Sequence, residues 1–201
     1  MVLTASTMLP LGAVAPPFAL PDTAGRTVRR DDFADKAGLL VLFLCNHCPY
    51  VQHVRQELAA IGRDYLPRDI AVVAINSNDG DAYPDDAYPS MAEEVERAGY
   101  PFPYLHDPTQ EVARAYRAAC TPDIFLFDHD RRLFDRDRRL VYRGQLDDSR
   151  PGSDIPVTGR DLRRALDGLL AGHPIDPAQR PSMGCNIKWR PGNAPPYFSG
   201  G

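Results

Sequence analysis

Two cysteines separated by two residues, Cys45 and Cys48, are the chemically most informative feature of the stretch "LFLCNHCPYVQH" (residues 42–53). A histidine, His47, lies between them, and a proline follows the second cysteine directly. Such a pair can be a redox dithiol, half of a metal site, or two ordinary buried thiols. A redox dithiol requires one thiol that readily forms a thiolate and a second thiol that resolves a mixed disulfide.

The residues around the pair predict a strand before it and a helix after it. The continuous apolar run over 38–44 predicts a strand buried on both faces, which ends directly before Cys45. After Cys48, apolar residues recur every three or four positions as far as Tyr65, as in an amphipathic helix. A thiol at a helix start meets unpaired N–H groups and the positive end of the helix dipole. We therefore predict that Cys45 is the low-pKa nucleophile and Cys48 the resolving thiol.

A zinc- or copper-binding module through Cys45 and Cys48, with Cys185 as a candidate third ligand, is the competing interpretation. Zinc usually takes its remaining ligands from a second CxxC or a paired histidine at matched spacing. Cys120 and Cys185 instead stand singly and far apart in the sequence. We therefore expect no metal and no other cofactor.

The rest of the chain predicts an α/β fold with a mixed sheet and helices on both faces. A strand–helix–strand order over 38–76 implies a parallel pair with a right-handed crossover. The repeat "FDHDRRL–FDRDRRL" is interpreted as a tandem duplication that lengthens the tip of a late antiparallel hairpin. The remaining predicted elements are a hairpin within 16–33, strands at 70–76, 124–127 and 140–144, and helices at 90–99, 107–119 and 162–170.

We predict one domain over residues 1–172, which includes the N-terminal hairpin, and a Pro/Gly-rich, irregular tail over 173–201. Ile187 and Trp189 indicate that this tail docks on the domain. Cys120 is either a packed thiol or close enough to the dithiol to take part in exchange. Cys185 is either an ordinary tail thiol or a third redox thiol, and the second alternative requires its sulfur to lie within disulfide reach of another.

Composition limits the partners and the location. The chain has 201 residues and a formal net charge of −4, which argues against a general nucleic-acid or anionic-membrane binder. The N-terminus lacks a basic start, and no apolar run approaches the ~20 residues of a membrane helix. We therefore expect a cytoplasmic protein without a nucleic-acid or membrane partner, whose cysteines are mostly reduced at rest.

The pattern as a whole resembles thioredoxin-fold proteins of the AhpC/TSA superfamily, in particular peroxiredoxin-like thioredoxin-family proteins with a CxxC motif. The resemblance rests on "GAVAPPFALPDTAGRTVRRDDF", "CNHCPYV", "CTPD" and "PSMGCNIKW", and it covers roughly residues 10–190. It implies that Pro122 is a cis-proline facing the dithiol and that Thr121 offers its backbone to an extended substrate. His47 repeats the histidine of strongly oxidising CPHC members, which implies that it tunes the thiolate.

The function that this resemblance implies is thiol–disulfide oxidoreduction. The substrates would be protein or small-molecule thiols and disulfides, and the reducing partner a thioredoxin or glutathione system. A thiol peroxidase acting on hydroperoxides is the alternative. Peroxiredoxins carry Pro-x-x-x-Thr-x-x-Cys, and aligning that cysteine with Cys48 places Cys45 at the threonine and Val41 at the proline. The usual peroxide-activating residues are therefore replaced, and we predict a thiol–disulfide oxidoreductase in preference to a thiol peroxidase.

Overall fold

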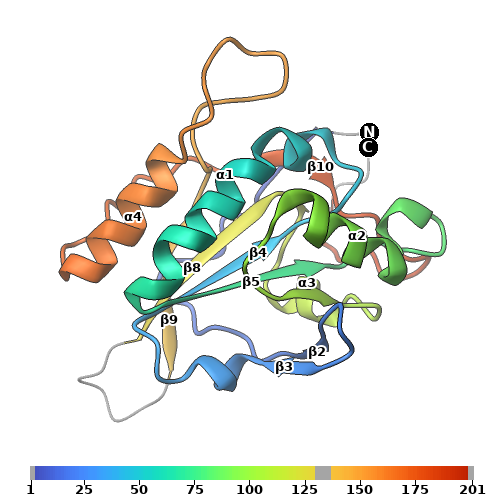
Figure 1. Cartoon of the computed structure of the whole chain (residues 1–201), viewed down its shortest axis with the longest axis horizontal. Helices are drawn as coiled ribbons and strands as arrows, with labels where there is room; N and C mark the ends of the chain where they lie inside the picture. Colours follow the sequence, from blue (N-terminus) through green and yellow to red (C-terminus); the bar gives the residue numbers. More distant parts are fainter. Residues whose placement is uncertain (1–2, 130–136, 199–201) are drawn as a thin grey trace.

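A five-stranded mixed sheet in the order β6-β5-β4-β8-β9 forms the centre of the computed structural model, which describes residues 3–129 and 137–198 (Figure 1). β4, β5 and β6 run parallel, and β8 is antiparallel to both β4 and β9. The predicted mixed sheet is therefore confirmed. Its strands are β4 (Gly38–Phe43), β5 (Ile70–Asn76), β6 (Tyr104–His106), β8 (Asp123–His129) and β9 (Arg138–Arg143).

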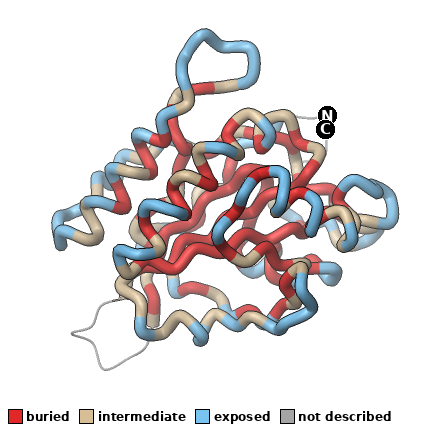
Figure 2. The backbone as a smooth tube through the Cα atoms, in the orientation of Figure 1, coloured by how far each residue is buried: buried red, intermediate tan, exposed pale blue. Residues whose placement is uncertain are grey.

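Helices cover both faces of this sheet, as predicted. α1 (Pro49–Tyr65), α2 (Tyr88–Ala98) and α4 (Arg160–Ala171) contribute to the hydrophobic cluster on one face. α3 (Glu111–Ala115) and the segment around the hairpin β2 (Ala19–Pro21)–β3 (Thr27–Arg29) contribute to the cluster on the other. Successive β4 side chains alternate between the two clusters, because neighbouring residues of a strand point to opposite faces. Figure 2 shows the central strands as the most deeply buried part of the chain.

The short helix α3 differs from the sequence prediction, which extended it over 107–119. It spans Glu111–Ala115 only. Gln110 before it and Arg117 after it both have a positive φ, of 61° and 52°, which ends the helical path on either side. Asp107 does not begin the helix; its carboxylate accepts a hydrogen bond from the Ala113 N–H. The predicted tandem-repeat tip of the β8–β9 hairpin lies outside the described residues.

The C-terminal segment contains a strand that the sequence did not predict. β10 (Met183–Asn186) pairs antiparallel with both β1 (Leu3–Ala5) and β7 (Cys120–Thr121). The interpretation of the tail as wholly irregular is therefore wrong at these residues, because backbone pairing on two sides stabilises a stretch that has no apolar pattern. Docking of the tail is confirmed: Ile187 is buried in the second cluster, and Trp189 packs against it.

Three 3-10 helices complete the described elements: η1 (Arg30–Phe33), η2 (Leu66–Arg68) and η3 (Pro84–Asp86). The last of these bears directly on the candidate site described below. Within residues 3–129 and 137–198, no helix combines the length and the apolar character needed to span a bilayer.

Candidate active site

The two motif cysteines lie where strand β4 gives way to helix α1. Cys45 follows the last residue of β4 by two positions, and Cys48 is the N-cap residue of α1, with Pro49 at the first helical position. This proline is favoured there because it has no N–H to leave unpaired. Both side chains are buried, and the four cysteines, all of them among the described residues, are thiols.

Thr121, the last residue of β7 (Cys120–Thr121), contacts both sulfurs of the motif. The Thr121–Pro122 peptide bond is cis, as the resemblance implied. Thr121 Oγ1 lies 3.1 Å from Cys45 Sγ, and Thr121 O lies 3.2 Å from Cys48 Sγ. The structure thus brings together Cys45, Cys48, Thr121 and Pro122, which the sequence had grouped.

The tail brings Cys185 into the same site. Its Sγ lies 2.8 Å from Cys48 Sγ, although 137 positions separate the two residues. In β10, Cys185 is paired with Thr121, so the backbone that we expected to be offered to a substrate strand is paired here with the protein's own tail. Cys120 behaves differently, because its Sγ lies 3.5 Å from Pro122 O and 3.9 Å from Ser182 O. These contacts agree with a packed thiol at Cys120.

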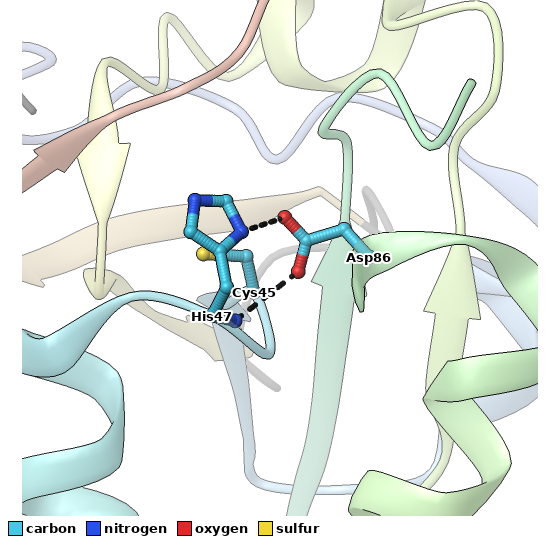
Figure 3. Close-up of side chains that lie close together, drawn as sticks. All are labelled: Cys45, His47 and Asp86. Atoms are coloured by element: carbon cyan, nitrogen blue, oxygen red, sulfur yellow. Dashed lines mark hydrogen bonds and ion pairs between the residues drawn. The ribbon is translucent and has the colours of Figure 1, made fainter. Parts of the chain in front are cut away.

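A buried carboxylate that sequence reasoning missed, that of Asp86 in η3, organises the CxxC turn. Asp86 Oδ1 accepts a hydrogen bond from the Asn46 N–H at 2.6 Å. Asp86 Oδ2 lies 2.5 Å from His47 Nδ1, a contact that Figure 3 draws. The Asn78 side-chain amide donates a third hydrogen bond, at 2.6 Å. Asp86 lies in the acidic repeat "DAYPDDAYP", which looks like a solvated loop, so its sequence context gave no signal of burial.

His47 is the partly exposed member of the motif. Its ring stacks on Tyr83, with centroids 5.5 Å apart and planes inclined by 7°. A cavity of about 280 Å³ opens beside it and is also lined by Gln52 and Arg97. The hydrogen bond that His47 Nδ1 donates to the Asp86 carboxylate raises the pKa of His47, so the imidazolium form is more favoured than in a free histidine. The ring lies next to the dithiol, because its nearest ligand atom falls within 4.8 Å of the Cys45 sulfur. The tuning role of His47 stays a prediction.

The contacts favour the thiolate on Cys48 rather than on Cys45. Hydrogen bonds from Cys185 and Cys45, together with the Val51 N–H, lower the pKa of Cys48, and they outweigh the effect of its burial. Burial, the hydrogen bond to Cys48 and the charge of Asp86 raise the pKa of Cys45. The prediction that Cys45 is the more acidic thiol stays a prediction, and these contacts favour the opposite order.

A second buried carboxylate, Asp123, directly follows the cis-proline. Burial raises its pKa to about 7, although several hydrogen bonds, including one from the Ala119 N–H, oppose this effect. Among the described residues, its Oδ1 has no hydrogen-bond partner. Asp123 is the last residue of the stretch "CTPD", and its burial was not predicted.

The groups that lie closest to a metal-binding arrangement are Cys45, His47 and Asp86, whose ligand atoms fall within 4.8 Å of one another. This set differs from the Cys45, Cys48 and Cys185 set that the sequence suggested. His47 Nδ1 and Asp86 Oδ2 already contact each other, so both would have to exchange that contact for an ion. The arrangement fits a histidine oriented by a carboxylate better than an open metal site.

The chain is similar to known proteins in sequence and in fold. The sequence profile described as the AhpC/TSA family matches residues 11–135. The curated thiol-disulfide oxidoreductase ResA of Geobacillus thermodenitrificans (strain NG80-2) is 28% identical over 134 residues, which are 65% of this chain and 70% of that protein. The chain is also similar to an uncharacterized conserved protein from Geobacillus kaustophilus, at 53% identity and a TM-score of 0.89, over 95% of this chain and 98% of that one.

A more distant solved structure bears on the fold alone. It is a thiol:disulfide interchange protein of the thioredoxin family from Chlorobium tepidum TLS. It superimposes with a TM-score of 0.58 at 16% identity, over 79% of this chain and 97% of that one. The predicted thioredoxin-like fold is therefore confirmed.

Proposed function

Because the chain belongs to the AhpC/TSA family, we propose that it is a thiol–disulfide oxidoreductase whose redox pair is Cys45 and Cys48. Family membership and the similarity to ResA identify it as an oxidoreductase. The observation that supports this dithiol is the Thr121–Pro122 loop, which contacts Cys45 Sγ at 3.1 Å and Cys48 Sγ at 3.2 Å. A strand end, a helix N-terminus and a cis-proline loop thus converge on two thiols.

The proposed reaction begins with the thiolate of Cys48. It attacks one sulfur of a substrate disulfide, which forms a mixed disulfide and releases the first substrate thiolate. Cys45 then loses its proton and attacks the Cys48 sulfur, so that a Cys45–Cys48 disulfide forms and the second substrate thiolate leaves. The imidazolium of His47, oriented by Asp86, stabilises negative charge in the site. The sequence predicted the opposite order of attack, which would require Cys45 to form a thiolate near the Asp86 carboxylate.

The substrates belong to the class of thiols and disulfides that the family implies. We propose that a thioredoxin or glutathione system returns the dithiol to its reduced form, and that the protein works in the cytoplasm, where that reduction is sustained.

Trapping of mixed disulfides tests the proposal. All variants carry Cys185→Ser, which removes the third sulfur from the site, and glutathione disulfide is the substrate. We expect Cys45→Ser to accumulate a glutathione adduct on Cys48, because its resolving thiol is missing, and Cys48→Ser to accumulate none. An adduct found only on Cys45 in Cys48→Ser would restore the order predicted from the sequence. Absence of disulfide reduction by the wild-type protein would refute the oxidoreductase proposal itself.

A thiol peroxidase is the second candidate, because Cys48 holds an N-cap position where a thiolate is stabilised. Against it stands the replacement of the usual proline and threonine by Val41 and Cys45. Rapid peroxide consumption with a sulfenic acid on Cys48, measured on the same reduced and metal-free sample, would favour it. Stoichiometric zinc or copper that survives dialysis, without either activity, would indicate a metal-binding module.

A further inference from the structure

A third thiol, outside the CxxC motif, touches the sulfur of Cys48. Cys185 Sγ lies 2.8 Å from Cys48 Sγ. A disulfide bond measures about 2.05 Å, so an approach of roughly 0.8 Å would bring the two sulfurs to bonding distance. Cys48 also interacts with the other motif thiol, Cys45, through a side-chain hydrogen bond. Cys48 therefore lies between two possible disulfide partners.

The fold holds Cys185 in this place by backbone contacts on both sides of its strand. Cys185 is paired with Leu3 of β1 and with Thr121 of β7. At the preceding residue, Gly184, an added Cβ would overlap the Thr121 carbonyl, so only glycine allows this close approach. Three residues after Cys185, the Lys188 N–H donates a hydrogen bond to Asn78 Oδ1 at 2.9 Å, which holds the chain just after β10 against the loop that follows β5. The proximity of the two sulfurs thus follows from the register of β10.

The charges around Cys185 also suit exchange with an oxidised Cys48. In the reduced site, the hydrogen bond to Cys48 and burial raise the pKa of Cys185, whereas the positive charge of Lys188 lowers it. Once Cys48 is part of a disulfide, its thiolate is gone and the largest cause of that elevation is removed. The Lys188 ammonium, which donates to Asn186 O at 2.8 Å, stays in place.

We propose that Cys185 is a third catalytic thiol, which converts the Cys45–Cys48 disulfide into a Cys48–Cys185 disulfide. The proposal rests on the proposed function. In this step the Cys185 thiolate attacks Cys48 Sγ, the Cys45–Cys48 bond breaks, and its electron pair stays on Cys45 as a thiolate. The proton that Cys185 lost passes to Cys45, so one disulfide replaces another and no further oxidant is consumed. The oxidised protein then has its tail covalently linked to α1 and its Cys45 returned as a thiol.

Disulfide mapping of the full-length protein tests this inference. Wild type, Cys45→Ser and Cys120→Ser are oxidised with glutathione disulfide, alkylated, and digested without reduction for mass spectrometry. We expect Cys48–Cys185 peptides in all three proteins, together with Cys45–Cys48 peptides in wild type and Cys120→Ser. In Cys45→Ser, attack of Cys185 on the Cys48–glutathione adduct should give Cys48–Cys185 as the single intramolecular disulfide. The double variant Cys45→Ser/Cys185→Ser should lose that product and retain the glutathione adduct.

Failure of the third-thiol proposal and failure of the proposed function give different results in this experiment. If wild type reduces glutathione disulfide and yields Cys45–Cys48 peptides only, while Cys45→Ser retains the adduct, the third thiol is refuted and the two-cysteine enzyme stands. If wild type forms no Cys45–Cys48 disulfide and reduces no substrate, the proposed function fails. Cys120→Ser is the matched control, because Cys120 is a buried thiol whose sulfur contacts carbonyl oxygens.

Discussion

Replacement of the buried Asp123 by asparagine should change how the stability of the protein depends on pH. The pKa of Asp123 is raised by burial to about 7, against ~3.9 for an unfolded aspartate. Between these values the folded state binds a proton that the unfolded state has released, so this residue makes stability fall as pH rises from about 4 to about 7. A difference of about three pKa units corresponds to about 4 kcal/mol.

Asp123→Asn removes this titration. Its neutral side chain can still accept the hydrogen bond from the Ala119 N–H, while its amide NH2 takes the place of the unpartnered Oδ1. That amide changes the free energy of unfolding by an amount that does not depend on pH. Between pH 4 and pH 8, the free energy of unfolding of the variant should therefore rise by about 4 kcal/mol relative to that of wild type, or roughly 8–16 °C in Tm.

Urea unfolding or thermal melts of the reduced proteins across this pH range measure the difference. Asp154→Asn, at an exposed position, controls for the substitution itself. A difference between Asp123→Asn and wild type that stays constant from pH 4 to pH 8 would refute the assignment of the raised pKa to Asp123.

Three other expectations follow from the site. In Cys45→Ser, the proposed Cys48–Cys185 disulfide would close a loop across 137 positions. Oxidation should therefore raise the free energy of unfolding of this variant by about 5 kcal/mol in the chain-entropy model. Equal urea midpoints for the oxidised and reduced variant would contradict the crosslink. Gly184→Ala should detach β10 from β7 and expose the motif thiols. Alkylation of these thiols at fixed pH should then accelerate at least about tenfold. An alkylation rate equal to that of wild type would show that the packing is unaltered and contradict this expectation. Asp86→Asn should lower the pKa of His47 in NMR titrations, since Asp86 raises it. The stability that the His47–Asp86 pair contributes is fully present below about pH 6.5 and is lost as pH rises through the raised pKa of His47. If the free energy of unfolding of Asp86→Asn depends on pH as that of wild type does, this contribution is refuted.

The central part of the fold could be predicted because its signals are local. The apolar run of β4 is long enough to identify a strand buried on both faces, and the three-to-four-residue period of α1 identifies a helix. Strands β7 and β10 have two and four residues, with sequences "CT" and "MGCN" that carry neither alternation nor an apolar run. They form through pairing with distant backbone, which no local pattern reports.

In the candidate site, too, some features could be predicted from the sequence and others depend on distant residues. Cys45, Cys48 and Pro122 are recognisable from motif and resemblance, because their spacing is itself the signal. The acidity of the two thiols depends instead on which one becomes the N-cap, and on the Asp86 carboxylate, 40 positions beyond Asn46. A boundary of one or two residues at the start of a helix is beyond what periodicity can resolve, so the sequence could not decide which of the two cysteines is the N-cap residue.

The three-stranded arrangement β1-β10-β7 has a consequence for synthesis of the protein. A ribosome releases Cys45 and Cys48 long before it has translated Cys185, and β10 is needed to cover Thr121. During this interval the nascent chain carries the dithiol without its third sulfur and without the strand that occupies the cis-proline loop. Every newly made molecule therefore passes through a stage in which its thiols are open to oxidants and to the cysteines of other proteins, and this stage ends only once β10 has been translated and paired.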